Sequence, residues 1–303
     1  MIVNSQYLDL AYRGFKTVCT DACNTAPTTW DKIAMTVPSG VREETYGWLG
    51  QFPQMREWLG GERVLKDIEA HSYTIVNRKF ESTLNIRRED FDDDRLGIFK
   101  PMIAEMGHTA RLHPEELIYG LLETGTSALC YDGQNFFDTD HPTVDAAGNA
   151  TFTSNYDDGS SGVPGPTWYL FDTSRAIKPI IWQERDRYDF QTINSTQDTR
   201  VFMTDEFLYG VRARVNAGFG LWQLAFASKA PLTIQNYVAA RTAMMRLRGD
   251  QGRILGIKPN TMVVPPELED DALHILNTEL TETGGSNPYK ATAELVVTPF
   301  LAA

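Results

Sequence analysis

Residues 36–90 constrain the fold of this chain more than any other part of the sequence. A Val-Pro-Ser-Gly turn at residues 37–40 is followed by further breakers, which are Gly47, Gly50, Pro53, Gly60 and Gly61. The same segment holds four large aromatic residues, Tyr46, Trp48, Phe52 and Trp58. A segment of about 55 residues with so many breaks cannot build its own core, and structureless loops beyond about 15 residues are uncommon in compact domains. Two interpretations stay open: an extended loop that packs on another subunit, or an irregular layer on its own domain.

Amphipathic helices are predicted on both sides of this segment. Apolar residues recur at roughly helical spacing over residues 7–18, and the breaker-rich run after them makes this helix an arm ahead of the main body. A second helical face is formed by Phe99, Met102, Ile103, Met106 and Ala110. Pro114 suits the first turn of a further helix over residues 115–123, so we expect a helical pair.

The rest of the chain mixes strand and helix signals. Alternating or β-branched runs predict strands over residues 72–87, 168–172, 179–184 and 207–215, with antiparallel pairing as the simplest arrangement. Residues 131–167 are typical of a surface loop. Thr233 can cap a helix that runs to about residue 247, and strand, helix and strand follow at 261–264, 267–280 and 293–297. The fold class is therefore α+β, with no repeat of 20 to 50 residues.

Composition excludes several classes of protein. The 303 residues carry 28 Lys+Arg against 40 Asp+Glu, a net charge of −12, which argues against a DNA-reading protein that neutralises phosphates. Cys19, Cys23 and Cys130 are too few for a disulfide framework and indicate reduced thiols. No apolar run is long enough for a membrane span and no secretory signal is present, so we expect a cytoplasmic protein.

The sharpest candidate for chemistry is the string of Asp138, Asp140 and His141, which could hold a divalent ion or act as acid and base. Asp in a turn before a proline is ordinary loop chemistry, so a structural turn is favoured. Cys19 and Cys23 would share one helix face, and without a second pair they are interpreted as buried or semi-buried thiols. The carboxylates of residues 90–94 are interpreted as helix-capping and solvated groups. We find no phosphate loop, dinucleotide fingerprint, nucleophile elbow or zinc-protease motif.

Several strings, spread over nearly the whole chain, resemble the Mu-like phage major head subunit, or gpT, family of major capsid proteins. They are MIVN (1–4), YGWLG (46–50), CYDGQNFF (130–137) running into DHP (140–142), IKP (177–179), GFGLWQ (218–223), LGIKP (255–259) and VVPP (263–266). The resemblance implies the Hong Kong 97-like phage capsid fold. It implies an N-terminal arm at 1–35, an extended loop at 36–90, a spine helix and the start of the peripheral domain at 91–125, a mainly axial domain at 126–280 and a C-terminal strand returning to the peripheral domain at 281–303.

The resemblance also implies a function in assembly and not in catalysis. The chain would be the major head protein of a Mu-like tailed bacteriophage or prophage, forming pentamers and hexamers of an icosahedral shell around double-stranded DNA. It would be part of the virion, assembled in the bacterial host cytoplasm. The implied partners are further copies of the chain, a separate scaffold, a maturation protease, a portal and decoration proteins. No membrane, cofactor, metal ligand, catalytic residue or sequence-specific DNA contact is implied, and an acidic lining would avoid trapping the DNA.

Some related shells crosslink a Lys to an Asn between subunits. Lys66 or Lys79 would be the donor here, but the sequence identifies no matching Asn or carboxylate, so we assign no crosslinking site. Two alternatives stay open. One is a bacterial nanocompartment shell of the same fold that encloses an enzyme cargo. The other is a metal-dependent hydrolase that uses Asp138, Asp140 and His141.

Overall fold

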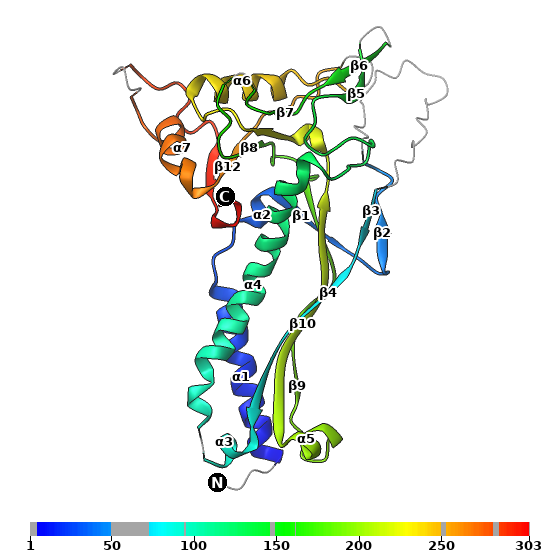
Figure 1. Cartoon of the computed structure of the whole chain (residues 1–303), viewed down its shortest axis with the longest axis vertical. Coiled ribbons are helices and arrows are strands. Elements are labelled where there is room, and N and C mark those ends of the chain that lie inside the picture. The colour runs from blue at the N-terminus through cyan, green and yellow to red at the C-terminus, as the bar shows by residue number, and fades with distance from the viewer. Residues whose placement is uncertain are drawn as a thin grey trace, which may run out of the picture.

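The computed structural model describes residues 5–49, 73–93, 95–145, 149–160, 162–249, 253–280 and 285–302, and the molecule is elongated (Figure 1). Its narrow part, which we call the trunk, consists of two long helices and three long strands: α1 (Ser5–Thr25), α4 (Lys100–Glu123), β4 (Arg78–Arg87), β9 (Ile180–Ile193) and β10 (Glu206–Phe219). The broader part at the upper end of Figure 1 is called the head.

Helix α1 confirms the helix expected over residues 7–18 and extends it at both ends. Its buried residues, Leu8, Ala11, Phe15 and Cys19, recur at helical spacing and form one apolar face. The helix packs along α4. Gly107 of α4 allows the two backbones to meet, because a Cβ atom there would overlap the carbonyl oxygen of Cys19.

Helix α4 shows that the predicted helical pair is wrong, because one continuous helix runs through Pro114. A proline inside a helix cannot donate to the carbonyl of Ala110 and destabilises the helix by about 3 kcal/mol or more. Pro114, Ile118 and Leu122 are all buried in the structure. Packing of this helix against the rest of the molecule therefore overrides the local preference for a break.

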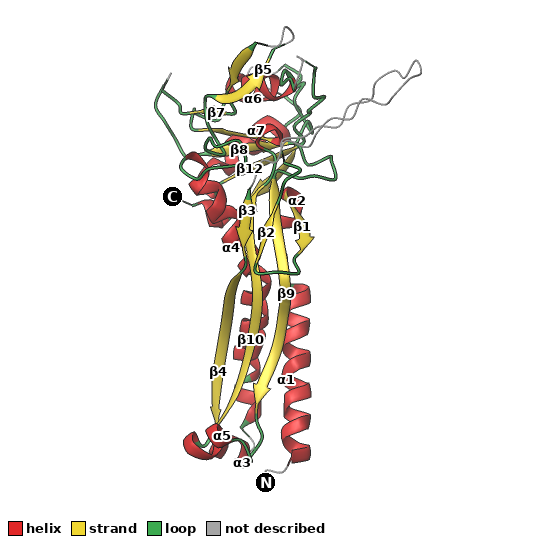
Figure 2. Cartoon of the chain, turned by 90° about the vertical axis from the view of Figure 1, so that its right-hand side faces the viewer, coloured by secondary structure: helices red, strands yellow, loops and turns green. Residues whose placement is uncertain are grey.

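The trunk sheet has the strand order β1-β9-β10-β4, with β1 (Ala34–Pro38) parallel to β9 and the other pairs antiparallel. The strands expected at 179–184 and 207–215 are thus confirmed as parts of longer, antiparallel strands. The helices lie on one face of this sheet (Figure 2). Helix α5 (Thr199–Thr204) joins β9 to β10 at the free end of the trunk.

The head contains a five-stranded sheet in the order β13-β12-β8-β11-β7. Its strands are β13 (Glu294–Val297), β12 (Thr261–Val264), β8 (Trp168–Phe171), β11 (Ala225–Ser228) and β7 (Tyr156–Asp157). Helix α6 (Ile234–Met245) packs on β11 and α7 (Glu269–Leu276) on β13. The hydroxyl of Thr233 accepts from the N–H of Asn236, so the predicted cap of α6 is confirmed.

Short elements complete the chain. They are α2 (Trp30–Ile33), β2 (Glu43–Thr45), β3 (Thr74–Val76), α3 (Arg88–Asp92), β5 (His141–Val144) and β6 (Ala150–Thr153), with 3-10 turns at Leu96–Ile98, Thr124–Thr126, Trp222–Leu224, Pro266–Leu268 and Pro299–Leu301. The single strand expected over residues 72–87 is divided at Asn77 into β3 and β4. The surface loop expected over 131–167 is wrong for Phe136, Phe137 and His141, which are buried.

Two hydrophobic cores follow this division. The trunk core is formed by α1, α4, β4, β9 and β10, together with Phe91 of α3 and Val201 of α5. The head core contains the head sheet, the upper end of α4 and the aromatic residues of the loop after it, including Phe136 and Phe137. Helix α4 contributes to both cores and so joins the two parts of the molecule.

Candidate functional site

The base of the segment over residues 36–90 is a two-stranded sheet of β2 and β3. Residues 50–72, which include Phe52, Trp58 and Lys66, lie outside the described residues. Within the described part, Tyr46 and Leu49 are buried in the head core, whereas Trp48 is 37% exposed. The base of the segment therefore packs on its own subunit, and both interpretations of the sequence stay open for residues 50–72.

A buried glutamine connects this base to the trunk sheet. Gln183 of β9 accepts a hydrogen bond from the hydroxyl of Tyr46 at 2.7 Å. Its amide nitrogen donates to the carbonyl oxygen of Ile75 at 3.1 Å and to Asn77 Oδ1 at 2.9 Å. Asn77 in turn donates to Ser39 Oγ at 2.8 Å and to the carbonyl oxygen of Val41 at 2.9 Å. These hydrogen bonds hold the two strands of the base, β2 and β3, against β9.

The end of the N-terminal arm is fixed to α4 by the buried carboxylate of Glu115. Its Oε1 accepts from the backbone N–H groups of Thr29 and Trp30, the second at 3.2 Å, and from the Thr29 hydroxyl at 3.0 Å. That hydroxyl also lies 2.7 Å from the hydroxyl of Tyr119. The carboxylate thus satisfies free N–H groups at the N-terminus of α2, which has no capping side chain of its own.

The free end of the trunk exposes apolar side chains. Phe202 and Met203 of α5 are 82% and 75% exposed. Ile98, in the 3-10 turn before α4, and Met102, in the first turn of α4, are also more than half exposed. Exposed apolar groups gathered at one end of a molecule are typical of protein interfaces. This end is therefore a candidate contact surface.

The predicted triad of Asp138, Asp140 and His141 does not come together as a metal site in the described part of the chain. The carboxylate of Asp138 accepts hydrogen bonds from the backbone N–H groups of Asn135 and Thr139 at 3.2 and 2.7 Å, and such bonds stabilise a turn. Asp140 is exposed, and partial desolvation together with Asp138 raises its pKa. Only His141 is fully buried. The structural interpretation of the two aspartates is the one that the geometry supports.

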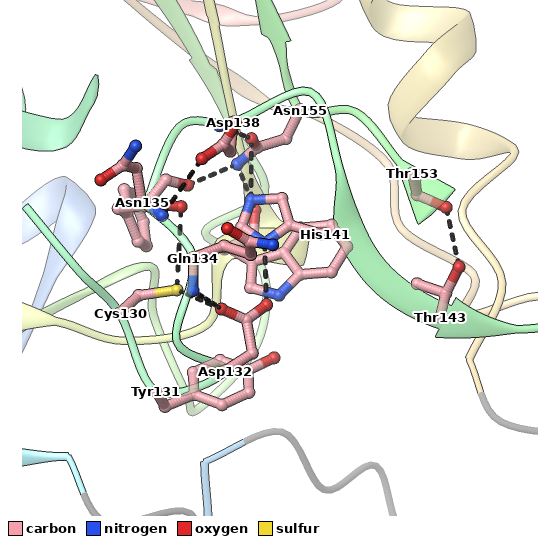
Figure 3. A network of polar contacts seen from close by, with 12 residues as sticks. Cys130, Tyr131, Asp132, Gln134, Asn135, Asp138, His141, Thr143, Thr153 and Asn155 are labelled. Carbon is pink, nitrogen blue, oxygen red and sulfur yellow. Dashed lines mark hydrogen bonds and ion pairs between the residues drawn. The ribbon is translucent and has the colours of Figure 1, made fainter. Parts of the chain in front are cut away.

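The partners of His141 are residues that the sequence analysis did not select (Figure 3). Its Nδ1 lies 2.8 Å from Asp132 Oδ2 and its Nε2 lies 3.2 Å from Asn155 Oδ1. The ring stacks on Trp222 with the ring centroids 3.9 Å apart. Asp132 and His141 stand within one of the strings that carry the family resemblance and Trp222 stands within another, whereas Asn155 shows no local signal.

Two further sequence hypotheses concern cysteines and carboxylates in the trunk. Cys19 is buried. This burial, and to a smaller extent the neighbouring Cys23, raises the pKa of its thiol to about 11, as expected for an unreactive group. Among residues 90–93, Asp90 lies 3.3 Å from Arg95 and Asp92 ends the short helix α3. These residues therefore form an element of their own ahead of α4.

Comparison with known proteins places nearly the whole chain in one family. A profile described as "Mu-like prophage major head subunit gpT" matches residues 8–301. The chain is 46% identical over 284 residues to the major capsid protein of Escherichia phage Mu, covering 91% of this chain and 92% of that protein. It is 43% identical over 276 residues to the Mu-like prophage FluMu major head subunit of Haemophilus influenzae, covering 90% and 89%.

Among solved structures, the chain matches a chain in the procapsid of bacteriophage JBD30 with a TM-score of 0.87 and 43% identity. The match covers 98% of this chain and 100% of that one. The α+β arrangement is accordingly the Hong Kong 97-like capsid fold. None of the described helices combines the length and the apolar character needed to cross a membrane.

Proposed function

Because this chain belongs to the Mu-like prophage major head subunit gpT family, a family of structural phage capsid proteins, we propose that it assembles as pentamers and hexamers into an icosahedral shell around double-stranded DNA. The observation that carries the proposal is the match to a procapsid chain over 98% of this sequence, because both the trunk and the head are included. The chain is thus a major capsid protein of the virion, and its role is structural.

The domain borders proposed from the sequence can be related to the trunk and head. The arm over residues 1–35 contains α1, and the spine helix over 91–125 is α4. The mainly axial domain over 126–280 supplies most of the head but also β9 and β10 of the trunk. The C-terminal strand over 281–303 is β13, which pairs with β12 in the head sheet.

The extended loop over residues 36–90 is proposed to reach a neighbouring subunit. Its base is held by Gln183, so the segment beyond can make contacts without carrying the fold of its own subunit. The apolar end of the trunk, with Phe202 and Met203, is proposed as a second contact with neighbouring copies. Many modest contacts, repeated by symmetry, produce a stable shell.

The further partners are proposed from the family and not from a contact in this structure. They are a separate scaffold, a maturation protease, a portal and decoration proteins, with assembly in the host cytoplasm. DNA would be enclosed without sequence-specific binding, in line with the net charge of −12. Lys79 of β4 remains in the described part of the chain, but no crosslink partner is proposed for it.

The proposal is tested by electron microscopy of the heaviest size-exclusion fraction, with the chain expressed alone and together with a candidate scaffold. Shells or hexamer patches are the expected result. A variant in which a short Gly-Ser linker replaces residues 50–72 should unfold as cooperatively as the wild type but form no shells. Monomers or dimers of the wild-type chain under both conditions would contradict the proposal, and enzyme cargo without DNA inside shells would favour a nanocompartment.

A further inference from the structure

We propose that Cys130, Asp132 and His141 bind a divalent transition-metal ion, and that the ion is Zn²⁺. One ligand atom from each residue, a thiol sulfur, a carboxylate oxygen and a ring nitrogen, lies within 4.8 Å of the other two. These are the three donor types that Zn²⁺ takes in proteins. The set disfavours Mg²⁺ and Ca²⁺, which prefer oxygen ligands alone.

The side chain of Asn155 determines which nitrogen of His141 is available. Its amide nitrogen donates to the carbonyl oxygen of Phe136 at 2.8 Å, and its amide oxygen accepts from the backbone N–H of Asp138 at 2.9 Å. These two backbone groups fix the orientation of the amide, so its oxygen faces His141 Nε2 at 3.2 Å. Nε2 therefore carries a proton that it donates, and Nδ1 is the nitrogen that can bind a cation.

A cation must lie between His141 and Asp132. Nδ1 is 2.8 Å from Asp132 Oδ2, and two lone pairs at this distance would repel each other. Either a proton or a metal ion can occupy that position. A metal-binding histidine usually donates its other N–H to a fixed oxygen, as His141 does to Asn155. This second hydrogen bond supports coordination independently of the distances among the three ligand atoms.

Cys130 supplies the third ligand. Its Sγ lies 3.0 Å from Asp132 Oδ1. Burial, and to a smaller extent the negative charge of Asp132, raises the pKa of the thiol. A bound Zn²⁺ reverses this preference, because a coordinating thiol is deprotonated. Binding therefore forms bonds from the metal to sulfur, nitrogen and oxygen. It releases two protons to solvent, one from the thiol and one from between Nδ1 and Oδ2.

The surroundings hold the three ligands in place. His141 has no exposed surface and stacks on Trp222, with 9° between the ring planes. Asp132 Oδ1 also accepts from the backbone N–H of Gln134 at 3.1 Å. The carbonyl oxygen of Asn135, 3.9 Å from Cys130 Sγ, or a water molecule would complete four ligands. The ion would then link the turn over residues 130–135 to β5 (Figure 3).

The test uses the full chain, freed of metal with a chelator and titrated with Co²⁺, which reports thiolate ligation through a charge-transfer band in the near ultraviolet. We expect one ion per chain and displacement of Co²⁺ by Zn²⁺. The apparent affinity should rise by up to roughly 100-fold per pH unit, since two protons are released. The measurement is made on unassembled chain, so its outcome is separate from that of the shell assay.

Variants identify the ligands. Cys130→Ser should remove the charge-transfer band and weaken Zn²⁺ binding at least about 100-fold, because a hydroxyl is a poor substitute for a thiolate. His141→Gln should weaken Zn²⁺ binding to a similar extent, although the Cys130 thiolate would still give the charge-transfer band at higher Co²⁺ concentrations. If it does not fold, Cys130→Ser decides, since serine differs from cysteine by one atom. The matched controls Cys19→Ser, in the trunk, and Asp140→Asn, at the exposed neighbour, should bind as the wild type does.

Two results would overturn the proposal. One is the absence of Co²⁺ and Zn²⁺ binding by the folded wild-type chain. The other is equal binding by the wild type and by Cys130→Ser. Either result would mean that a proton, and not a metal ion, lies between Asp132 Oδ2 and His141 Nδ1.

Discussion

The trunk and the head differ in how far their sheets are covered. In the trunk, helices lie on one face of the long sheet, and β10 alternates buried residues with more exposed ones over most of its length (Figure 2). In the head, every residue of β8, β11 and β12 is buried. A sheet covered on one face leaves a surface for other chains, whereas a fully covered sheet stabilises its own domain. The trunk is therefore the part whose packing we expect to be more easily changed.

Equal truncations in the two cores test this difference most strongly. Ile118 and Ile103 both lie on α4 without exposed surface, the first in the head core and the second in the trunk core. Ile118→Ala should lower the free energy of unfolding by about 4 kcal/mol and Ile103→Ala by about 3 kcal/mol, because the narrow trunk closes more readily around a cavity. Urea unfolding of unassembled chain measures both losses. A larger loss for Ile103→Ala would reverse the comparison.

Two glycines of α4 separate the close helix contact of the trunk from ordinary helix propensity. Gly107→Ala should destabilise the chain by about 3 kcal/mol, because the added methyl group overlaps the backbone of Cys19 and forces α1 away. Gly120→Ala is the control: a Cβ atom there meets nothing within 4 Å. This change should stabilise the chain by about 0.5 to 1 kcal/mol. Similar thermal shifts for both variants would show that α1 does not depend on the close approach.

The glutamine between head and trunk should have an intermediate effect. Gln183→Leu removes the partners of Tyr46 and Asn77, which should cost about 2 kcal/mol. Hydrogen exchange should accelerate selectively in β2 and β3. Gln191→Leu, at an exposed position of the same strand, is the control and should change stability by no more than about 0.5 kcal/mol. Unchanged exchange in β2 and β3 would show that the base is held by other contacts.

The smallest expected effect is a pH dependence of the trunk. Burial lowers the pKa of His113, whose Nδ1 lies 2.5 Å from the hydroxyl of Tyr188. The folded state then binds fewer protons than the unfolded chain, so this contribution is complete above about pH 6.5 and is lost as the pH falls below that value. Unfolding measured at about pH 7 and about pH 5 should show a larger loss for the wild type than for His113→Gln. Identical losses would exclude His113 as the cause.

Local patterns in the sequence predicted the elements better than their borders. The helical face from Phe99 to Ala110 and the alternation in residues 207–215 depend on neighbours only a few positions apart, and both elements are present. Pro114 led to a wrong break, because packing on both cores keeps α4 continuous. The buried position of residues 136, 137 and 141 was missed, because turn-forming neighbours mask a short apolar run.

The candidate metal site was only half visible in the sequence. His141 was selected, but with Asp138 and Asp140 as its companions, because they are its neighbours in the chain. The structure instead brings it to Asp132 and Asn155. A turn over residues 130–135 reverses the chain, so His141 contacts Asp132, nine positions away, and not Asp138 or Asp140, three positions and one position away.

By itself, the sequence determined the α+β class, the acidic character, the helical faces and, through strings spread along the chain, the resemblance to a capsid family. These properties depend on composition or on residues close together in the chain. Only the tertiary structure decided that β1 lies parallel to β9, that β13 joins the head sheet, and that Gly107 meets Cys19. Each of these contacts joins residues far apart in the sequence, where the free energy of burying the whole core, and no local preference, selects the pairing.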